Sequence, residues 1–371
     1  MPTTTPQPGQ VETKAPEQPQ RTRSPDQAVT DLTETLIVEP IGGEAIRPFQ
    51  YRASDEELAE LKRRIAATRW PDKETVDDDA QGVQLATIRK LADYWTNQYD
   101  WRKIEAEING YPNFITTIDG LDIHFIHVKS KHENALPVLV NHGWPGSVIE
   151  QFKIIGPLTD PTAFGGKAED AFDVVIPSMP GFGFSGKPAT TGWGPERMAA
   201  AWDLLMKRLG YDRYVAQGGD WGALIVDIMG LQSPSALLGI HTNMARAIPP
   251  ELDALAQRGA PAPDGLDEEE RYAFDHVSFF YTKGLGYALE MGNRPQTLYG
   301  IEDSPIGLAA WIIDHDIWTY RQISRLFDGE QLGLTRDDIL DNITLFWLTK
   351  TSVSASRLYW ENKDAFFPPC G

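Results

Sequence analysis

The feature that most constrains the fold is a series of short apolar runs that alternate with helical stretches. Such runs are typical of parallel strands buried on both faces. The four runs occupy residues 138–140, 174–176, 214–216 and 238–240. An amphipathic helix that begins with proline is predicted over residues 195–209, between the second and third runs. Alternating strands and helices predict an α/β fold with a parallel sheet.

Two further patterns precede these runs. Period-two alternation over residues 114–118 and 121–125, joined by Asp119-Gly120, predicts a β-hairpin. Upstream, Ser54 to Glu57 matches a capping box that begins a helix, and residues 85–95 form a second amphipathic helix. Neither helix carries a chemical motif, so together they predict a structural arm that packs on a larger unit.

The chain of 371 residues is long enough for two domains, or for one large domain with an insertion. Residues 1–40 contain seven prolines and no aromatic residue, which predicts a disordered tail. After residue 247 the strand signals stop and an aromatic-rich helical lid is predicted. The expected division is a tail (1–40), an arm (41–112), an α/β core (113–246), a lid (247–345) and the start of the core's C-terminal part (346–371).

Charge and composition exclude several classes of function. A net charge of −19 at pH 7 disfavours binding to nucleic acids or to anionic membranes. A single cysteine, Cys370, excludes an intrachain disulfide framework. No run approaches the roughly 20 apolar residues that span a bilayer, and no secretory signal is recognised, so we expect a cytoplasmic protein. The sequence does not determine the oligomeric state.

The spacing of the histidines does not match that of metal ligands. His124 and His127 lie in a predicted strand at an odd spacing, which places them on opposite faces. We therefore expect neither a metal nor any other cofactor.

The segment Gly218-Gly219-Asp220-Trp221-Gly222 lies between a predicted strand and a predicted helix. It matches the small-x-nucleophile-x-small pattern of a nucleophile elbow, with Asp220 as the nucleophile. Such a turn lifts the central side chain above the sheet and points the backbone N–H of Trp221 into the site. The alternative is an ordinary strand-to-helix turn in which Asp220 only caps the helix.

Two loops flank this segment in the predicted core. The loop at residues 142–147 can supply the N–H of Trp144 to an oxyanion hole, and we interpret His142 as a structural histidine that orients it. The segment 181–186 matches G-x-G-x-x-G, but Pro188, Gly192 and Gly194 precede the next helix. Dinucleotide binding needs a helix that opens directly on the glycines, so a sharp loop near the site is the preferred interpretation.

These motifs, in this order, make the chain resemble the epoxide hydrolases of the microsomal type, within the α/β-hydrolase superfamily. The resemblance extends over residues 46–363 and also includes the arm segment 68–72 and the lid segment 303–309. It implies an α/β-hydrolase fold, with a mostly parallel sheet, a helical lid and an N-terminal helical arm.

The resemblance also implies a two-step reaction on a small apolar epoxide and water. Asp220 attacks an epoxide carbon and forms an ester. Tyr359 is the proton donor to the epoxide oxygen, and Tyr287 is the candidate second donor. A histidine oriented by an acid then activates water, while the N–H groups of Trp144 and Trp221 hold the oxyanion.

In that family the acid and the histidine of the second step follow the tyrosine that corresponds to Tyr359. The last histidine of this chain is His315, inside the predicted lid. We therefore expect a truncated C-terminal part that lacks the last strands, an unpaired sheet edge, and a reaction impaired in its second step.

Two other functions remain open from the residues. One is a haloalkane or haloacid dehalogenase, which also uses an elbow aspartate, with Trp221 binding halide. The other is a non-catalytic remnant that only binds hydrophobic ligands in the lid pocket.

Overall fold

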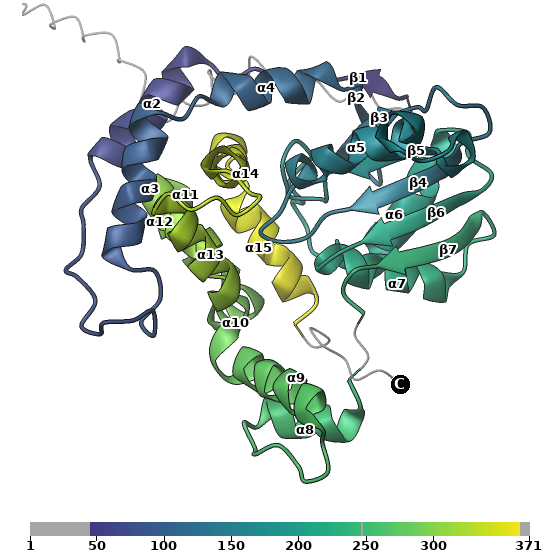
Figure 1. Cartoon of the computed structure of the whole chain (residues 1–371). Helices are drawn as coiled ribbons and strands as arrows, with labels where there is room; N and C mark the ends of the chain where they lie inside the picture. Colours follow the sequence, from purple (N-terminus) through teal and green to yellow (C-terminus); the bar gives the residue numbers. More distant parts are fainter. Residues whose placement is uncertain (1–44, 246–247, 364–371) are drawn as a thin grey trace, which may run out of the picture. The chain divides into compact units, whose positions relative to one another are not determined.

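The structure is a computed structural model that describes residues 45–245 and 248–363. The predicted tail and Cys370 lie outside the described residues. Seven strands form one sheet in the order β1-β2-β3-β5-β4-β6-β7 (Figure 1). Their bounds are β1 (Arg47–Pro48), β2 (Asn113–Ile118), β3 (Leu121–Val128), β4 (Leu136–Asn141), β5 (Phe172–Pro177), β6 (Tyr214–Gly218) and β7 (Leu237–Thr242).

The sheet is mixed rather than mostly parallel. The pairs β1–β2, β2–β3 and β3–β5 are antiparallel, whereas β5, β4, β6 and β7 run parallel to one another. The hairpin accounts for the antiparallel side. Asp119 and Gly120 have φ values of 51° and 79°, the left-handed pair that a two-residue hairpin turn needs. The predicted hairpin and the four predicted strands are confirmed.

Strand β7 differs from the other parallel strands in its burial. Val138, Val174 and Ala216 are buried, as continuous apolar runs predict. Leu238 and Ile240 in β7 are 57% and 40% exposed, and among the described residues β7 pairs with β6 alone. Within the described chain β7 is therefore an edge strand.

Helices pack on the sheet and on one another. In the core, α5 (Phe152–Thr159) contacts β5, and α7 (Trp221–Gln232) contacts β6, β7 and α6 (Pro195–Arg208). The arm consists of α2 (Asp55–Ala66), α3 (Leu85–Asn97) and α4 (Trp101–Gly110). The further α-helices are α8 (Pro250–Gln257), α9 (Glu268–Phe279), α10 (Gly286–Asn293), α11 (Tyr299–Asp303), α12 (Pro305–Ile313), α13 (Ile317–Phe327), α14 (Arg336–Thr349) and α15 (Ser352–Glu361). No helix in the described part of the chain is long and apolar enough to cross a membrane.

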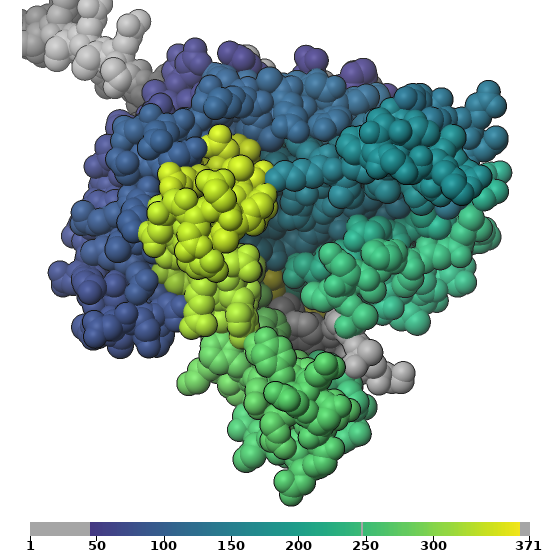
Figure 2. All heavy atoms as spheres, viewed as in Figure 1, coloured from purple at the N-terminus to yellow at the C-terminus, as the bar shows by residue number. Residues whose placement is uncertain are grey.

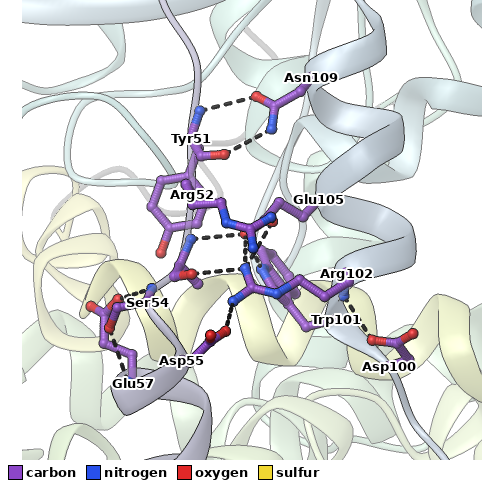
Figure 3. A network of polar contacts seen from close by, with 11 residues as sticks. Tyr51, Arg52, Ser54, Asp55, Glu57, Asp100, Trp101, Arg102, Glu105 and Asn109 are labelled. Carbon is purple, nitrogen blue, oxygen red and sulfur yellow. Dashed lines mark hydrogen bonds and ion pairs between the residues drawn. The ribbon is translucent and has the colours of Figure 1, made fainter.

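A polar network fixes the entry of the arm (Figure 3). The predicted capping box is present, since Ser54 Oγ accepts from the N–H of Glu57 and the Glu57 carboxylate accepts from the N–H of Ser54. The buried carboxylate of Glu105 accepts hydrogen bonds from the N–H of Ala53 at 2.8 Å and from the indole of Trp101 at 3.1 Å. A buried carboxylate requires such donors, so Glu105 attaches the segment before α2 to α4.

The helical layer extends beyond the predicted end of the lid at residue 345. Helix α14 ends only at Thr349, where Lys350 takes a left-handed conformation with φ 54°. Helix α15 then contacts α10 and α11, so residues 346–363 continue the helical layer. Figure 2 shows the yellow-green α14 beside the blue arm, where the indole of Trp95 donates to Thr344 at 3.0 Å.

Strand β3 contains a fully buried histidine with a consequence for acid stability. Burial lowers the pKa of His124 from 6.5 to about 3. Between these values the unfolded chain binds more protons than the folded one, so stability falls as pH falls below 6.5. We expect His124 to account for a loss of about 2 kcal/mol between pH 7 and pH 5. Urea titrations at both values check this, and His124→Gln should show a shallower loss; an unchanged pH slope would contradict it.

Candidate functional site

The turn between β6 and α7 has the geometry of a nucleophile elbow. Asp220 sits between them with φ 52° and ψ −125°, a conformation that non-glycine residues rarely adopt. A Cβ at Gly218 would overlap the carbonyl of Gly222, and a Cβ at Gly222 would overlap the carbonyl of Asn141. Only glycine therefore fits at these positions, and the strained turn presents Asp220 rather than merely capping the helix.

Backbone N–H groups surround the carboxylate of Asp220. The N–H of Trp144 donates to its Oδ1 at 2.7 Å, and the N–H of Trp221 also bonds it. Desolvation raises the pKa of Asp220, while these two N–H groups and the charge of His315 act to lower it. The two donors predicted for an oxyanion hole thus meet at the predicted nucleophile.

His142 belongs to the loop that carries Trp144, and its buried ring contacts main chain on both sides. Its Nδ1 hydrogen-bonds the carbonyl of Gly143 at 3.0 Å, and its Nε2 accepts from the N–H of Met179 at 3.2 Å. Burial lowers the pKa of His142 to about 4, so it is neutral at pH 7. Both ring nitrogens are used to hold main chain, which agrees with the interpretation of His142 as a structural histidine.

Aromatic packing brings Tyr287 from α10 and Tyr359 from α15 to the same place. The Tyr359 ring lies edge-on to Trp221 at 4.8 Å and to Trp144 at 5.6 Å, and Tyr287 stacks on Trp144 at 4.9 Å. Burial raises the pKa of both tyrosines, and the charge of Asp220 raises each further. Both phenols therefore remain protonated donors at neutral pH.

A cavity of about 740 Å³ opens on Asp220. Its lining includes Trp144 but neither tyrosine, whose rings pack against that indole. One part of the lining is polar, with Asn141, Glu150 and Gln217. The lid contributes apolar side chains, namely Ile312, Ile313, Ile323, Leu334 and Ile339, and the polar side chains of Thr319, Asp338 and Asn342.

Two titratable groups of this cavity were not recognised from the sequence as site residues. The side chain of Glu150 is exposed at the cavity, and desolvation together with the neighbouring Asp220 raises its pKa to about 8. His315, which follows α12, borders the same cavity. The only available signal for Glu150 was a carboxylate eight residues after His142, just beyond the loop already assigned to the site.

The other candidate ligand motifs do not meet at this cavity. The segment 181–186 turns through Gly181 and Gly183, both with positive φ, and α6 opens only at Pro195. A Cβ at Gly181 would press on the carbonyl of Ser354, so this loop packs beneath α15. In residues 45–245 and 248–363 no group of three His, Cys, Asp or Glu side chains is arranged to hold a metal ion.

Comparisons with known proteins agree with this geometry. Residues 46–151 match the family model described as "Epoxide hydrolase N terminus", and residues 137–284 match "alpha/beta hydrolase fold". A protein of Stigmatella aurantiaca (strain DW4/3-1) whose provisional name is epoxide hydrolase is 50% identical over 87% of this chain and 70% of its own length. Epoxide hydrolase 1 of Oryctolagus cuniculus is 37% identical over 87% of this chain and 74% of its own.

Solved structures give the same result. Juvenile hormone epoxide hydrolase from the silkworm Bombyx mori is 30% identical, with a TM-score of 0.73 over 90% of this chain and 79% of its own. The Aspergillus niger epoxide hydrolase is 30% identical, with a TM-score of 0.72 over 86% of this chain and 79% of its own. The chain therefore belongs to the epoxide hydrolases of the microsomal type, enzymes of the α/β-hydrolase superfamily that hydrolyse the ether bond of an epoxide.

Proposed function

We propose that this chain converts an epoxide to a vicinal diol through a covalent ester on Asp220. The observation that carries the proposal is the carboxylate of Asp220, held at a strained elbow by the N–H of Trp144 at 2.7 Å. Its free oxygen attacks an epoxide carbon, a C–O bond of the epoxide breaks, and the alkoxide takes a proton from the tyrosine pair. Tyr359 and Tyr287 suit this role because burial keeps them protonated.

In the second step water attacks the ester carbonyl of Asp220. The negative charge that develops on the carbonyl oxygen is stabilised by the N–H groups of Trp144 and Trp221, which already bond the free carboxylate. The histidine that borders the cavity in the described chain is His315, whose Nδ1 bonds the carbonyl of Ile312 rather than a carboxylate.

The cavity supports a small apolar epoxide as the substrate. The lid contributes isoleucine and leucine side chains to the cavity lining beside the polar Thr319, Asp338 and Asn342, and the core contributes Asn141 and Glu150. A substrate with an aliphatic or aromatic group against the isoleucine and leucine side chains directs its epoxide towards Asp220. Apolar contact of this kind supplies affinity, and the few polar groups fix orientation.

Rapid-quench kinetics with styrene oxide tests the proposal. We expect intact-protein mass spectrometry to find one adduct per chain within the first turnover, followed by slower diol release. Diol formation without any adduct, or no reaction at all, would contradict the ester mechanism. Chloride release from 1-chlorobutane without epoxide turnover would instead indicate a dehalogenase.

Replacing the tyrosines should slow the first step. We expect Tyr359→Phe and Tyr287→Phe each to reduce the rate of adduct formation by about 10²-fold, because the leaving alkoxide loses a proton donor. The double variant should lose more than either single variant. The exposed Tyr299 gives the control, and Tyr299→Phe should react at the rate of the unmodified protein. Adduct formation at an unchanged rate in the double variant would refute the assignment.

A further inference from the structure

We infer that a second cavity, beside α15, is a binding site for an amphipathic carboxylate, a molecule with one anionic end and an apolar chain. The volume of this cavity is about 870 Å³. Among the described residues its lining shares none with the cavity that opens on Asp220, so the two sites are separate.

The second cavity lies on the side of α15 away from the elbow. Its main walls are the loop 188–193, residues 293–297 after α10, and α15 itself. Arg357 and Glu361 line it, two residues before and two residues after Tyr359. In an α-helix this spacing places both side chains about 160° around the axis from Tyr359, whose ring packs on Trp221 of the elbow.

Hydrogen bonds and stacking hold these walls in place. Both carboxylate oxygens of Glu361 lie 3.0 Å from the nitrogen of Gly192, whose N–H donates to them and joins the loop to α15. The hydroxyl of Ser354 donates to the carbonyl of Gly181 at 2.7 Å. The buried Trp193 carries the guanidinium of Arg197 at 4.2 Å from its ring centroid. A ligand therefore meets walls that are already ordered, which lowers the entropic cost of binding.

Two guanidinium groups suit the anionic end of the ligand. The charged side chains of the lining are Arg294, Arg357 and Glu361, and Glu361 is already engaged by Gly192. Arg357 donates to the neutral amide oxygen of Gln296 at 3.2 Å. No carboxylate of the described chain pairs with Arg294 or with Arg357. A guanidinium matches a carboxylate in geometry as well as in charge, so these arginines select an anion.

Apolar side chains provide for the chain of the ligand. Trp193, Met198, Leu358 and Trp360 line the same cavity, and the ring of Trp360 is 36% exposed. An apolar chain laid on these residues removes that surface from water. A neutral ligand would leave both arginines without a counterion, and a dianionic phosphate would be repelled more strongly by Glu361. A monoanionic carboxylate with an apolar chain fits both parts of the lining.

Titration calorimetry of the full chain with sodium octanoate tests the inference. Arg357→Gln removes one guanidinium. Ala189→Trp fills the cavity with a large side chain and leaves both arginines in place. Arg271→Gln is the matched control, because Arg271 is an exposed arginine of α9 outside the lining of both cavities. Thermal melting checks that each variant is folded, and octan-1-ol serves as the uncharged probe.

We expect octanoate to bind the unmodified protein with a Kd below about 1 mM. Arg357→Gln and the change of probe to octan-1-ol should each weaken binding at least about tenfold, since a charge-assisted hydrogen bond is lost. Ala189→Trp should abolish binding, and Arg271→Gln should leave it unchanged. Absence of binding, equal affinity for octan-1-ol, or equal affinity in folded Arg357→Gln and Arg271→Gln would each overturn the inference. No epoxide enters this test, so its result is independent of the proposed function.

Discussion

Substituting Asp220 with Asn should abolish both the covalent adduct and diol formation, a loss of about 10⁴-fold or more. An amide does not attack a saturated carbon, and no other carboxylate is held by the N–H of Trp144. The amide oxygen of Asn can still accept that hydrogen bond, so we expect the fold to be retained. Intact-mass measurement after incubation with styrene oxide, together with thermal melting, checks both expectations.

Helix α7, which follows Asp220, supplies the control variant for Asp220→Asn. Asp227 is an exposed carboxylate in α7, about two turns beyond the elbow. Asp227→Asn changes the net charge by the same amount and should form the adduct at the unmodified rate. Retention of a stoichiometric adduct in Asp220→Asn would show that another residue is the nucleophile and would contradict the ester mechanism.

Local signals were sufficient for the elements that hold the site. Each of these elements was predicted from a few consecutive residues, and the structure confirms them. They are the Asp119-Gly120 turn, the capping box at Ser54 and the apolar strands β4, β5 and β6. The elbow was also predicted from a short run of consecutive residues. Its glycines are needed because the main chain of Gly222 passes against Asn141, a close approach that the spacing of small residues encodes.

Elements that depend on distant partners were not predicted. Helix α4 is stabilised by Glu105, whose donors include the N–H of Ala53 far upstream, and no periodicity reveals that contact. Strand β1 is two residues long and exists through its pairing with β2. The antiparallel side of the sheet likewise follows from the pairing of β3 with β5, which a strand-by-strand interpretation does not specify.

The site residues likewise divide into those that a local motif predicts and those that only folding brings together. Asp220, Trp144 and Trp221 lie in motifs, so the sequence could name them, whereas Tyr287 and Tyr359 depended on the family resemblance. Glu150 and His315 belong to no motif of their own and become noticeable only because folding places them at the cavity of Asp220. Desolvation and the charge of Asp220 raise the pKa of Glu150 to about 8, and both depend on the packed molecule rather than on the local sequence.

The second large effect is expected at Gly222, in the first turn of α7. Exchange of glycine for alanine in a helix normally adds stability of about 1 kcal/mol. At Gly222 we expect the opposite, a loss of about 3 kcal/mol or more, together with loss of adduct formation. The added Cβ would overlap the carbonyls of Asn141 and His142, and these are backbone atoms that cannot rotate away. Urea denaturation of Gly222→Ala, with the adduct assay, measures both effects.

Gly110, the last residue of α4, is the matched control. A Cβ there meets no atom within 4 Å, so Gly110→Ala should leave the free energy of unfolding within about 1 kcal/mol and the adduct rate unchanged. The contrast separates the intrinsic preference of a helix for alanine from the contact that the elbow requires. A Gly222→Ala protein as stable and reactive as Gly110→Ala would mean that β4 and α7 can move apart, and that the elbow does not depend on their close approach.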